Sequence, residues 1–443
     1  MTSGASLSAS PAAGQPLRLG VAGLGTVGAG LAILLRDNAE LITARAGRPI
    51  VITAVAARDR TRDRGVDLGA CRWHDDAAEL ATDPDVDVVV ELIGGAEGKA
   101  RELVEAALAN RKPVVTANKA LVAVHGEALG RLSEKQSTPL LYEAAVAGGI
   151  PAIKTVREGL AADRLLRIGG ILNGTCNYIL TAMRETGRDF ADVLAEAQAL
   201  GYAEADPSTD VDGVDAAHKL AILASLAFGR PVQFDSVHVE GIRQIGALDL
   251  SAAKALGYRI KLLGLTRQTE RGIEARVSPC LVPHTSPIAQ VDGVFNAVIA
   301  EGAFVGRLMV EGRGAGAGPT ASAVAADLID LARGKPASVW GVSAAELEPV
   351  RSRPISEREG AFYLRLSVAD RAGVLADITA ILRDCGVSLN SMVQHPAVEA
   401  GADVPLILVT HPTREAGMQD ATTRIAALPV VSETPILIRI ETI

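Results

Sequence analysis

The chain has 443 residues, 48% of them hydrophobic, and this length predicts two or three domains, each large enough to bury its own core. Its 44 Lys and Arg residues against 52 Asp and Glu residues give a net charge of −8 without a basic block, which argues against a nucleic-acid or anionic-membrane partner. No apolar run reaches the roughly 18 residues of a membrane span, and the four cysteines have neither metal-ligand spacing nor a disulfide pattern, so we expect a cytoplasmic protein.

The N-terminal part predicts a leader and a nucleotide-binding domain. Residues 1–16 are small and polar, without the charged and apolar regions of a signal peptide, and we expect a disordered leader. Residues 17–24 form an apolar run that ends in Gly23-Leu24-Gly25-Thr26-Val27-Gly28, and a helical pattern follows at once. In this context the glycines allow a tight turn and close approach of a pyrophosphate to the helix N-terminus. We expect a Rossmann-type NAD(P)-binding domain over residues 17–150, with a simple packing turn as the alternative.

The second expected strand, residues 50–57, ends at Arg58-Asp59-Arg60. In Rossmann folds an acidic residue near this point binds the ribose 2′-hydroxyl of NAD, whereas an arginine accommodates the 2′-phosphate of NADP. Arg58 and Arg60 therefore favour binding of NADPH, whereas Asp59 leaves binding of NADH as an alternative. All three residues could instead be solvated loop charges.

Two further strands are expected in the centre of this sheet. Residues 86–93 form an apolar run with one glutamate, which is typical of a strand buried on both faces. A helix is predicted over 98–110 and a strand over 112–116, and Thr116 and Lys119 mark the exit of that strand. Ligands of such sheets bind beyond the carboxyl ends of the strands, so Lys119 is a candidate site residue, although most lysines at strand ends are merely solvated. A further strand is expected over 139–150, and a helix over 151–160.

From residue 165 the pattern becomes richer in strands. Strands are expected over residues 165–172, 237–242, 259–266, 273–281 and 303–310, with few helical crossovers between them. They predict an α+β substrate and dimerisation domain with an open mixed sheet over residues 151–314. The glycine-rich segment 312–320 then opens a helix over 321–331, and its amides either face an anion or form part of a hinge.

Residues 168–228 carry the strongest candidate chemistry. Asn173-Gly174 is a turn signal before a helical pattern, and five carboxylates occur within residues 204–215. The following helix places Asp215 and Lys219 four residues apart on one face. Such a pair is often a surface ion pair that contributes ~0.5 kcal/mol or less. Here an apolar run follows Lys219 directly, so we expect the lysine at the mouth of a core, where it can give or take a proton.

The C-terminal part predicts a further domain. Residues 336–360 are rich in proline, serine and charge, and we expect a linker. Residues 361–443 show strand and helix patterns in the order βαββαβ, a ferredoxin-like unit. Such a unit can fold by itself, and its open sheet edges would pair with another copy of the chain. We therefore expect a homo-oligomer.

Several motifs resemble known families. Residues 172–180 (LNGTCNYIL) and 201–207 (GYAEADP), followed by Asp215 and Lys219, closely resemble the signature of homoserine dehydrogenases, and the resemblance extends over nearly the whole chain. Residues 370–375 (DRAGVL) resemble ACT domains, which bind amino acids in many biosynthetic enzymes. The resemblance implies a monofunctional NAD(P)-dependent oxidoreductase with a C-terminal ACT domain, because only a short segment precedes the nucleotide fold. It would reduce L-aspartate 4-semialdehyde to L-homoserine with NADPH, on the path to threonine, isoleucine and methionine.

The resemblance also implies roles for individual residues. Lys219 would be the proton donor, and Lys119 a second cation near the substrate and the nicotinamide. The implied substrate-binding residues are Glu204, Asp215, Gly201 and Asp210. The implied cofactor-binding residues are Gly23, Gly25, Thr26, Val27, Gly28, Arg58, Thr116, Lys119 and Gly318, and residues 315–335 would complete the nucleotide domain. A structural monovalent cation, Na⁺, would be bound by Glu143, Val146, Gly148 and Ile150, unless Glu143 is only a hydrogen-bonded carboxylate at a strand end.

The sequence also predicts an effector site in the C-terminal domain and leaves two other functions as alternatives. By family analogy L-threonine would bind near residues 370–375, whose amides at a helix start suit a carboxylate. Alternatively, the ACT domain only holds a homodimer or homotetramer together. A different ACT-regulated NAD(P)-dependent oxidoreductase of amino-acid metabolism would fit the domains but not the motif over 173–219. A non-catalytic nucleotide and amino-acid sensor is disfavoured by the intact set Lys119, Glu204, Asp215 and Lys219.

Overall fold

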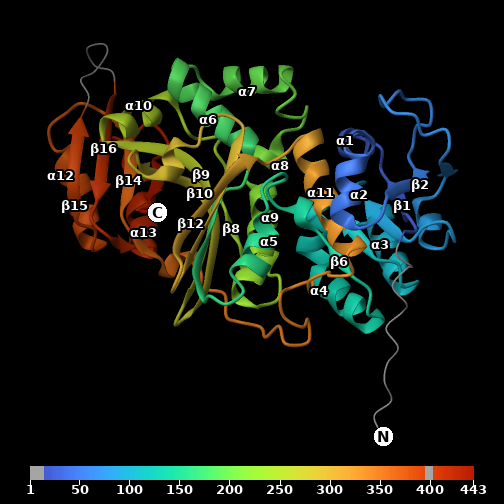
Figure 1. Ribbon diagram of the computed structural model, residues 1–443. Helices are drawn as coiled ribbons and strands as arrows, with labels where there is room; N and C mark the ends of the chain where they lie inside the picture. Colours follow the sequence, from blue (N-terminus) through green and yellow to red (C-terminus); the bar gives the residue numbers. More distant parts are fainter. Residues whose placement is uncertain (1–13, 395–402) are drawn as a thin grey trace, which may run out of the picture. The chain divides into compact units, whose positions relative to one another are not determined.

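The computed structural model of the protein describes residues 14–394 and 403–443, so most of the expected leader lies outside the described residues. The chain divides into two compact units, and Figure 1 labels many of their helices and strands. The first contains the described part of Met1–Leu165 with Ala221–Phe234 and Ala300–Pro349, and the second contains Leu166–Leu220, Asp235–Ile299 and Val350–Ile443. None of the helices in the described ranges is both long and apolar enough to cross a membrane.

The first unit is built on a six-stranded parallel sheet with the order β3-β2-β1-β4-β5-β6. This is the strand order of the dinucleotide-binding Rossmann fold, as predicted. The strands are β1 (Leu17–Ala22), β2 (Ile50–Ala56), β3 (Arg72–His74), β4 (Val88–Glu91), β5 (Val114–Thr116) and β6 (Leu140–Leu141). The helices are α1 (Thr26–Asp37), α2 (Ala39–Ala46), α3 (Lys99–Ala109), α4 (Lys119–Gln136), α5 (Ala152–Lys154) and α11 (Ala317–Ala332).

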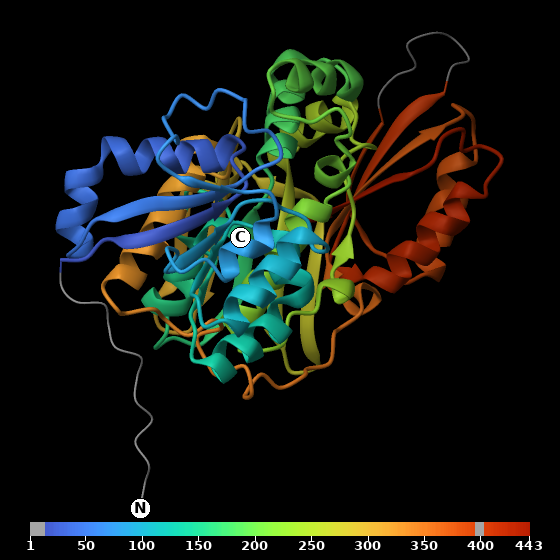
Figure 2. The ribbon, with the colours of Figure 1, turned by 90° about the vertical axis from the view of Figure 1, so that its right-hand side faces the viewer.

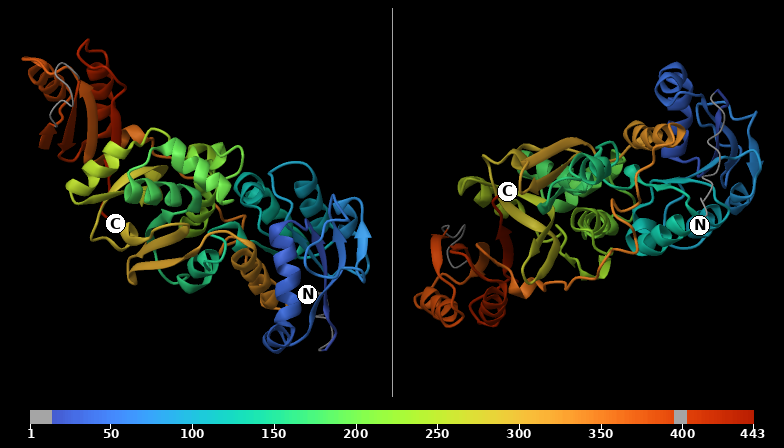
Figure 3. Two further views of the ribbon diagram at one scale, coloured as in Figure 1. Left: turned by 90° about the horizontal axis from the view of Figure 1, so that it is seen from above. Right: turned by 60° about the horizontal axis from the view of Figure 1, so that its bottom comes forward.

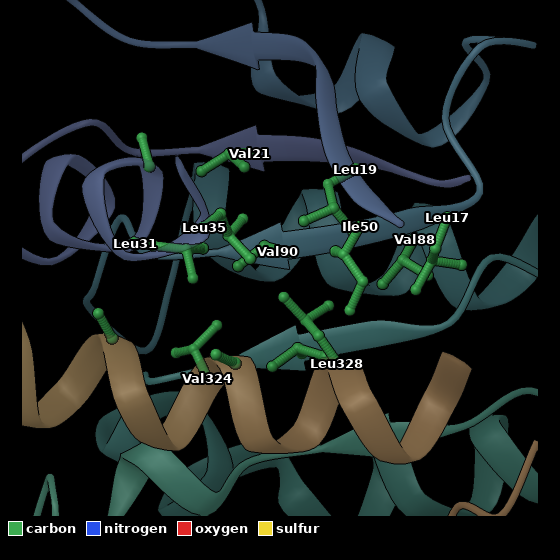
Figure 4. Close-up of a cluster of buried hydrophobic side chains, with 14 of the residues drawn as sticks. Leu17, Leu19, Val21, Leu31, Leu35, Ile50, Val88, Val90, Val324 and Leu328 are labelled. Carbon is green, nitrogen blue, oxygen red and sulfur yellow. The ribbon is translucent and has the colours of Figure 1, made fainter. Parts of the chain in front are cut away.

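Helix α11 packs on this sheet although it comes late in the sequence. Val324 and Leu328 of α11 belong to a buried cluster that also contains Leu19 of β1 (Figure 4). The helix lies alongside α1, as the left view of Figure 3 shows. Gly30 of α1 permits this approach, because a Cβ there would lie only 2.8 Å from Ala317 O. The core of the nucleotide-binding unit is therefore closed by a segment from beyond residue 300.

The prediction of a strand over residues 139–150 is wrong for most of its length. Only β6 is extended, and a 3₁₀ turn (Glu143–Ala145) and a buried loop follow it. Ala147 and Gly148 have φ angles of 56° and 51°, in the left-handed region, which is incompatible with a continuing strand. The apolar composition of this segment reflects a buried loop, not a strand.

The second unit is built on a mixed sheet that contains the order β11-β7-β9-β10-β18-β14-β16-β15, with β8 beside β10. β9 and β10 form a long antiparallel hairpin. The strand expected over 303–310 is misplaced, because residues 303–305 turn the chain and Gly306 has a φ of 72°. The strands of this unit before the ACT region are β7 (Leu165–Ile171), β8 (His238–Val239), β9 (Tyr258–Thr269), β10 (Gly272–Pro283) and β11 (Phe295–Gly302). The next strand in the chain, β12 (Gly306–Arg313), falls within the residues of the first unit. The helices are α6 (Gly174–Thr186), α7 (Phe190–Ala199), α8 (Ser208–Val211), α9 (Val214–Phe228) and α10 (Ala247–Ala255).

The C-terminal part of the second unit has the predicted βαββαβ order. Its antiparallel sheet, β18-β14-β16-β15, is covered on one face by α12 and α13, as Figure 2 shows. Ile378 and Leu382 of α12 pack with Leu364 of β14 in a core that belongs to this part alone. The elements are β14 (Phe362–Val368), α12 (Val374–Asp384), β15 (Leu389–Gln394), β16 (Val404–Thr410), α13 (Glu415–Ala426) and β18 (Ile436–Ile440), with the small pair β13 (Glu359–Gly360) and β17 (Thr413–Arg414).

One edge of the ACT sheet is already paired within the chain. Residues 439–440 of β18 pair in parallel with residues 280–281 of β10. Tyr363 Oη and Arg365 Nε of β14 also donate to Asp249 Oδ1 of α10 at 3.0 and 2.7 Å. The expectation of open sheet edges is therefore wrong for β18, while β15 forms the other end of this sheet.

The segment expected as a linker is partly packed. Trp340 is 1% exposed, and its ring centroid lies 5.5 Å from that of Tyr142. Gly126 and Gly130 of α4 leave the necessary space, because a Cβ at either position would lie within 2.8 Å of the indole. The start of the segment is thus part of the first unit, and its remainder has little regular structure.

Candidate functional site

The turn between β1 and α1 has the geometry of a dinucleotide-binding loop. Gly23 has a φ of 95°, and a Cβ there would lie 2.4 Å from Leu92 O. Gly28 is equally constrained, because its Cβ would lie 2.1 Å from Gly23 O. A Cβ on Gly25 would meet nothing within 4 Å among the described residues, so the start of α1 faces open space. The three positions thus provide the tight turn, the close helix packing and the ligand approach of a Rossmann loop.

Two helix N-termini of the first unit offer backbone amides. Thr26 and Val27 form the first turn of α1, where the amides have no partner within the helix. Gly318 lies in the first turn of α11 and is exposed. Since N-terminal amides and the helix dipole favour negative charge, both positions suit a phosphate group.

The loop after β2 is cationic, and its single candidate carboxylate is engaged locally. Asp59 Oδ1 accepts from Thr61 Oγ1 at 2.7 Å and from Thr61 N at 2.8 Å, and these bonds lower the pKa of the carboxyl. Arg58 is exposed, and Arg64 Nε donates to Leu24 O of the glycine turn at 3.2 Å. Sequence reasoning missed Arg64, because only the tertiary fold returns it to that turn. The loop thus exposes Arg58 beside the end of β2 and holds Asp59 in local hydrogen bonds.

The exits of β4 and β5 are tied together by Glu91, which is fully buried. Its Oε2 accepts from Thr116 Oγ1 at 2.5 Å, and its Oε1 accepts from the amides of residues 93 and 94 at 2.7 and 3.0 Å. Thr116 is therefore placed as a buried partner of Glu91. The lone glutamate in an apolar strand was the signal for this role, because a buried carboxylate needs donors.

Lys119 begins α4 directly after the cap residue Asn118. Asn118 Oδ1 accepts from Leu121 N at 3.1 Å, and its Nδ2 donates to Gly95 O at 2.7 Å. The cap therefore links the start of α4 to the loop after β4. Lys119 is half-buried at this strand exit, the place at which sequence analysis expected it.

In the second unit, α9 carries Asp215 and Lys219 on one face. Lys219 is 8% exposed and Asp215 is 4% exposed. Lys219 Nζ donates to Asp215 Oδ2 at 2.6 Å and to Leu172 O at 2.7 Å. An ammonium group has three N–H donors, so one remains for a further acceptor. This pair is not the solvated surface pair considered above, because burial reduces screening and both partners of the lysine are fixed.

Asn173 organises the same centre. It caps α6, with Oδ1 accepting from Cys176 N at 2.8 Å. Its Nδ2 donates to Asp215 Oδ2 at 2.9 Å and to Asp210 Oδ1 at 2.7 Å. From the sequence, Asn173-Gly174 is interpreted only as a turn signal, although an asparagine before a helical pattern is also a typical helix cap. The hydrogen bonds from Asn173 to the two carboxylates could not be predicted, because Asp210 and Asp215 reach it only through the tertiary fold.

The neighbouring thiol is inert. Burial, together with Asp210 and Asp215 nearby, raises the pKa of Cys176 well above its ordinary value. A thiol in such surroundings stays protonated and is a poor nucleophile. Lys219 is therefore the group of this centre that suits proton transfer.

Two of the predicted substrate residues lie outside this hydrogen-bonded centre. Gly201 follows α7 with a φ of 74°, and Glu204 is exposed on the same loop. The carbonyl of Glu204 accepts from Gln198 Nε2 at 3.0 Å. Among the described residues, the fold thus brings Asp215 to Lys219 and links Asp210 to them through Asn173, and it leaves Gly201 and Glu204 on an exposed loop.

The predicted cation ligands lie in the buried loop after β6. Glu143 Oε1 and Oε2 accept from the amides of residues 153 and 154 at 3.0 and 2.8 Å. Burial and then the charge of Asp327 raise the pKa of Glu143 to about 7. Each carboxylate oxygen keeps a second lone pair, so the group can still accommodate a cation. The other predicted ligands in this loop are Val146, Gly148 and Ile150.

Asp327 and Lys154 surround Glu143 and were missed from the sequence. Glu143 N donates to Asp327 Oδ2 at 2.9 Å, and Lys154 Nζ lies 3.3 Å from Asp327 Oδ1. In the described ranges, no group of three or more His, Cys, Asp or Glu side chains is arranged to hold a metal. A cation beside Glu143 would therefore rely on backbone carbonyls for its remaining ligands.

Comparisons with known proteins agree along the chain. Residues 23–143 match the NAD-binding domain of homoserine dehydrogenase, residues 151–329 match homoserine dehydrogenase, and residues 362–430 match the ACT domain. The chain is 49% identical to a homoserine dehydrogenase of Pseudomonas aeruginosa and 46% identical to one of Neisseria gonorrhoeae, covering 96% and 97% of this chain and 99% of each relative.

Solved structures give the same result. A homoserine dehydrogenase from Thiobacillus denitrificans matches with a TM-score of 0.90 at 46% identity, covering 97% of this chain and 99% of that one. A hyperthermophilic archaeal homoserine dehydrogenase in complex with NADPH matches with a TM-score of 0.62 at 25% identity, covering 73% of this chain and 99% of that one.

Proposed function

Because the chain belongs to the homoserine dehydrogenase family, an NAD(P)-dependent oxidoreductase family, we propose that it reduces L-aspartate 4-semialdehyde to L-homoserine with NADPH. The observation that carries this proposal is the placement of Lys219, which is buried and held by Asp215 and Leu172 O. The reduced nicotinamide, when bound, supplies the hydride. The chain must then stabilise the negative charge that develops on the aldehyde oxygen.

Lys219 supplies the proton in this proposal. Its two hydrogen bonds orient the ammonium, and the third N–H is directed to the aldehyde oxygen. Asp215 holds the lysine in place through the hydrogen bond to Nζ. Lys119 acts as the second cation near the substrate, which is supported by its position at the exit of β5.

The substrate ammonium is bound by carboxylates. Asp215 and Asp210 are linked through Asn173, and Glu204 and Gly201 lie on the loop that precedes them in the sequence. Glu204 is exposed in this structure, so its role requires the substrate to reach that loop. The ammonium is attracted to this loop because it carries several carboxylates and no Lys or Arg between residues 201 and 218.

NADPH is proposed as the preferred cofactor, and the basis for this preference is the loop after β2. Asp59 is bonded to Thr61, whereas Arg58 is exposed next to the strand end. We propose that the pyrophosphate binds at the turn formed by Gly23, Gly25, Thr26, Val27 and Gly28. The other proposed cofactor contacts are Thr116, Lys119 and Gly318. This set is supported by the space beside Gly25 and by the packing of α11 against α1.

A Na⁺ ion is proposed at Glu143 with the carbonyls of Val146, Gly148 and Ile150. It is supported by the buried charge of Glu143, which a cation would offset. Its role is structural, because the loop precedes α5 and supports the packing between β6 and α11.

L-Threonine is proposed as an effector at residues 370–375, and a homodimer or homotetramer as the assembly. A cytoplasmic location is proposed because the four cysteines are free thiols, which are typical of a reducing compartment.

The activity is tested with the purified full-length chain, L-homoserine and either NADP⁺ or NAD⁺, by following the absorbance of the reduced nicotinamide. L-Serine, one methylene shorter, is the control substrate. We expect turnover with L-homoserine, faster with NADP⁺, and little with L-serine. Absence of turnover with both nicotinamides would overturn the proposal.

A further inference from the structure

Arg439 of strand β18 joins the ACT domain to the preceding part of the second unit. The residue is 3% exposed. Its Nη1 and Nη2 donate to Glu240 Oε2 and Oε1 at 2.5 and 2.9 Å, which makes a bidentate pair. Its Nε donates to Glu415 Oε2 of α13 at 3.1 Å, so one guanidinium group binds a carboxylate on each side of this junction. Such fork-shaped pairs fix the orientation of both partners.

Glu240 directly follows β8, and both its backbone and its side chain are held. Its N–H donates to Val277 O of β10 at 2.8 Å. Its Oε1 also accepts from His238 Nε2 at 2.7 Å. Burial alone would raise the pKa of Glu240, but the hydrogen bonds from His238 and Arg439 lower it to about 2. The carboxylate is therefore ionised at neutral pH, and Arg439 has a charged partner.

The residues after Glu240 contact the end of α8, which leads into the lysine centre. Ile242 N donates to Val211 O of α8 at 2.9 Å. Gly241 lies against the same carbonyl, because a Cβ there would be only 2.2 Å from Val211 O. Both contacts join backbone to backbone. A displacement of residues 240–242 therefore reaches α8 without a flexible side chain between them.

The turn formed by α8 and the start of α9 depends on such support because it is short and acidic. Helix α8 has four residues, and a helix of that length is not stable by itself. Asp210 of α8 and Asp215 of α9 both accept from Asn173 Nδ2. Asp212 lies between them and accepts from Arg243 Nε at 2.5 Å. Since the three carboxylates repel one another, their positions are set by the groups that hold the turn.

We propose that Arg439 is a positioning residue of the lysine centre. Through Glu240 it fixes residues 240–242, and these fix the end of α8, which carries Asp210. The ACT domain thereby supports binding of the substrate ammonium through a residue that is none of the proposed substrate contacts. The substrate part of this inference rests on the proposed function. The hold of Arg439 on residues 208–215 does not, and it can be measured without turnover.

The test compares four variants of the full-length protein. Glu240→Gln keeps the shape of the side chain but removes its charge, and Arg439→Gln removes the guanidinium. Arg439→Lys keeps the charge without the fork and is the second variant if Arg439→Gln does not fold. The matched control is Arg365→Gln, because Arg365 Nε of β14 also donates to a carboxylate across the junction, Asp249 Oδ1 of α10, at 2.7 Å. The melting temperature of each variant establishes that it is folded.

Hydrogen exchange of the protein without ligands, followed by mass spectrometry, measures the hold on the turn. We expect peptides over residues 208–215 and 240–245 to exchange about fivefold or more faster in Glu240→Gln and Arg439→Gln. Arg439→Lys should be intermediate, and Arg365→Gln should exchange like the unaltered protein. Unchanged exchange in folded Glu240→Gln and in a folded Arg439 variant would overturn the proposal. Equal acceleration in Arg365→Gln would overturn it as well, because any loosening of the junction would then have the same effect.

Steady-state kinetics test the effect on the substrate. We expect KM for L-homoserine to rise about fivefold or more in Glu240→Gln and Arg439→Gln, with a smaller change in kcat and a nearly unchanged KM for NADP⁺. The double variant should show no more than the larger single effect, because the two residues act as one pair. Parallel rises in KM for both substrates would overturn the positioning role. Absence of turnover in the unaltered protein would instead overturn the proposed function, and hydrogen exchange would then decide the role of Arg439.

Discussion

The side-chain amide of Asn173 donates to Asp215 Oδ2 at 2.9 Å. The same oxygen accepts from Lys219 Nζ at 2.6 Å, so the asparagine positions the carboxylate that positions the lysine. Asn173 also caps α6, which anchors it independently of α9. The geometry of the proposed proton donor therefore depends on a residue that need not touch the substrate.

Replacing Asn173 with serine should separate these two functions. Serine keeps a capping oxygen but lacks the amide donor that holds Asp215. A hydrogen bond to a charged group contributes ~1.5–3 kcal/mol, which corresponds to about a tenfold to hundredfold lower kcat. Asn173→Ala should show the same loss of kcat together with a further ~1 kcal/mol lower stability from the missing cap. Equal kcat for Asn173→Ser and the unaltered protein, measured with saturating L-homoserine, would remove the positioning role.

Replacing Arg58 with aspartate should shift cofactor preference from NADPH towards NADH. The new carboxylate repels the 2′-phosphate and can accept from a ribose hydroxyl. The measurement is the ratio of kcat/KM values for the two cofactors, which we expect to change by about tenfold or more in favour of NADH. Arg62→Asp, an exposed change in the same loop, is the control. If both variants have the same ratio as the unaltered protein, the phosphate is bound elsewhere.

Glu143 predicts a specific dependence of stability on pH and on monovalent cations. Its pKa rises from 4.5 to about 7 in the fold, mainly through burial. Between these values the folded protein binds more protons than the unfolded chain, so the free energy of unfolding falls as the pH rises through this window. Glu143→Gln should flatten that decline, whereas Glu102→Gln, at an exposed position of α3, should not.

A bound cation favours the ionised form of Glu143. NaCl should therefore raise Tm above pH 7 relative to choline chloride at equal ionic strength, and should have little effect at pH 5. Choline, an organic cation much larger than Na⁺, serves as the comparison for general salt effects. Equal stabilisation by the two salts at pH 8, or an unchanged NaCl effect in Glu143→Gln, would contradict a cation at this site.

L-Threonine should inhibit the full-length protein through residues 370–375. Asp370→Ala changes the loop before α12 without touching a residue proposed for catalysis, and it should weaken the inhibition about tenfold while the uninhibited rate stays the same. Asp384→Ala, at the opposite end of α12, is the matched control. Removing the whole domain is a poorer test, because it would strip β18 from β10 and leave Asp249 without two partners. Unaltered turnover in the presence of excess L-threonine would leave the domain a structural role.

Local patterns predicted the parts of the fold that depend on local chemistry. The glycine turn between β1 and α1 follows from glycines at 23, 25 and 28, and two of these have backbone neighbours so close that no side chain fits. The βαββαβ order of the ACT domain follows from alternating strand and helix periodicity. The pair Asp215–Lys219 follows from the four-residue spacing of one helix.

Features that depend on distant segments could not be read in this way. The contact of Glu143 with Asp327 and the pairing of β10 with β18 join residues far apart in the sequence. Helix α4 escaped prediction because Gly126 and Gly130 weaken its helical pattern, and their role is to receive Trp340. The loop over 142–150 resembles a strand in composition because it is buried, although its backbone turns at Ala147.

Lys219→Ala tests most directly whether Lys219 transfers the proton during hydride transfer. The measurement is kcat for L-homoserine oxidation together with Kd for NADP⁺, compared with Lys254→Ala, an exposed lysine on α10. We predict that Lys219→Ala lowers kcat about 10²–10⁴-fold, leaves the Kd for NADP⁺ nearly unchanged, and melts within a few degrees of the unaltered protein. A Lys219→Ala protein that keeps the kcat of Lys254→Ala would reduce Lys219 to an ion-pair partner of Asp215 and contradict the account.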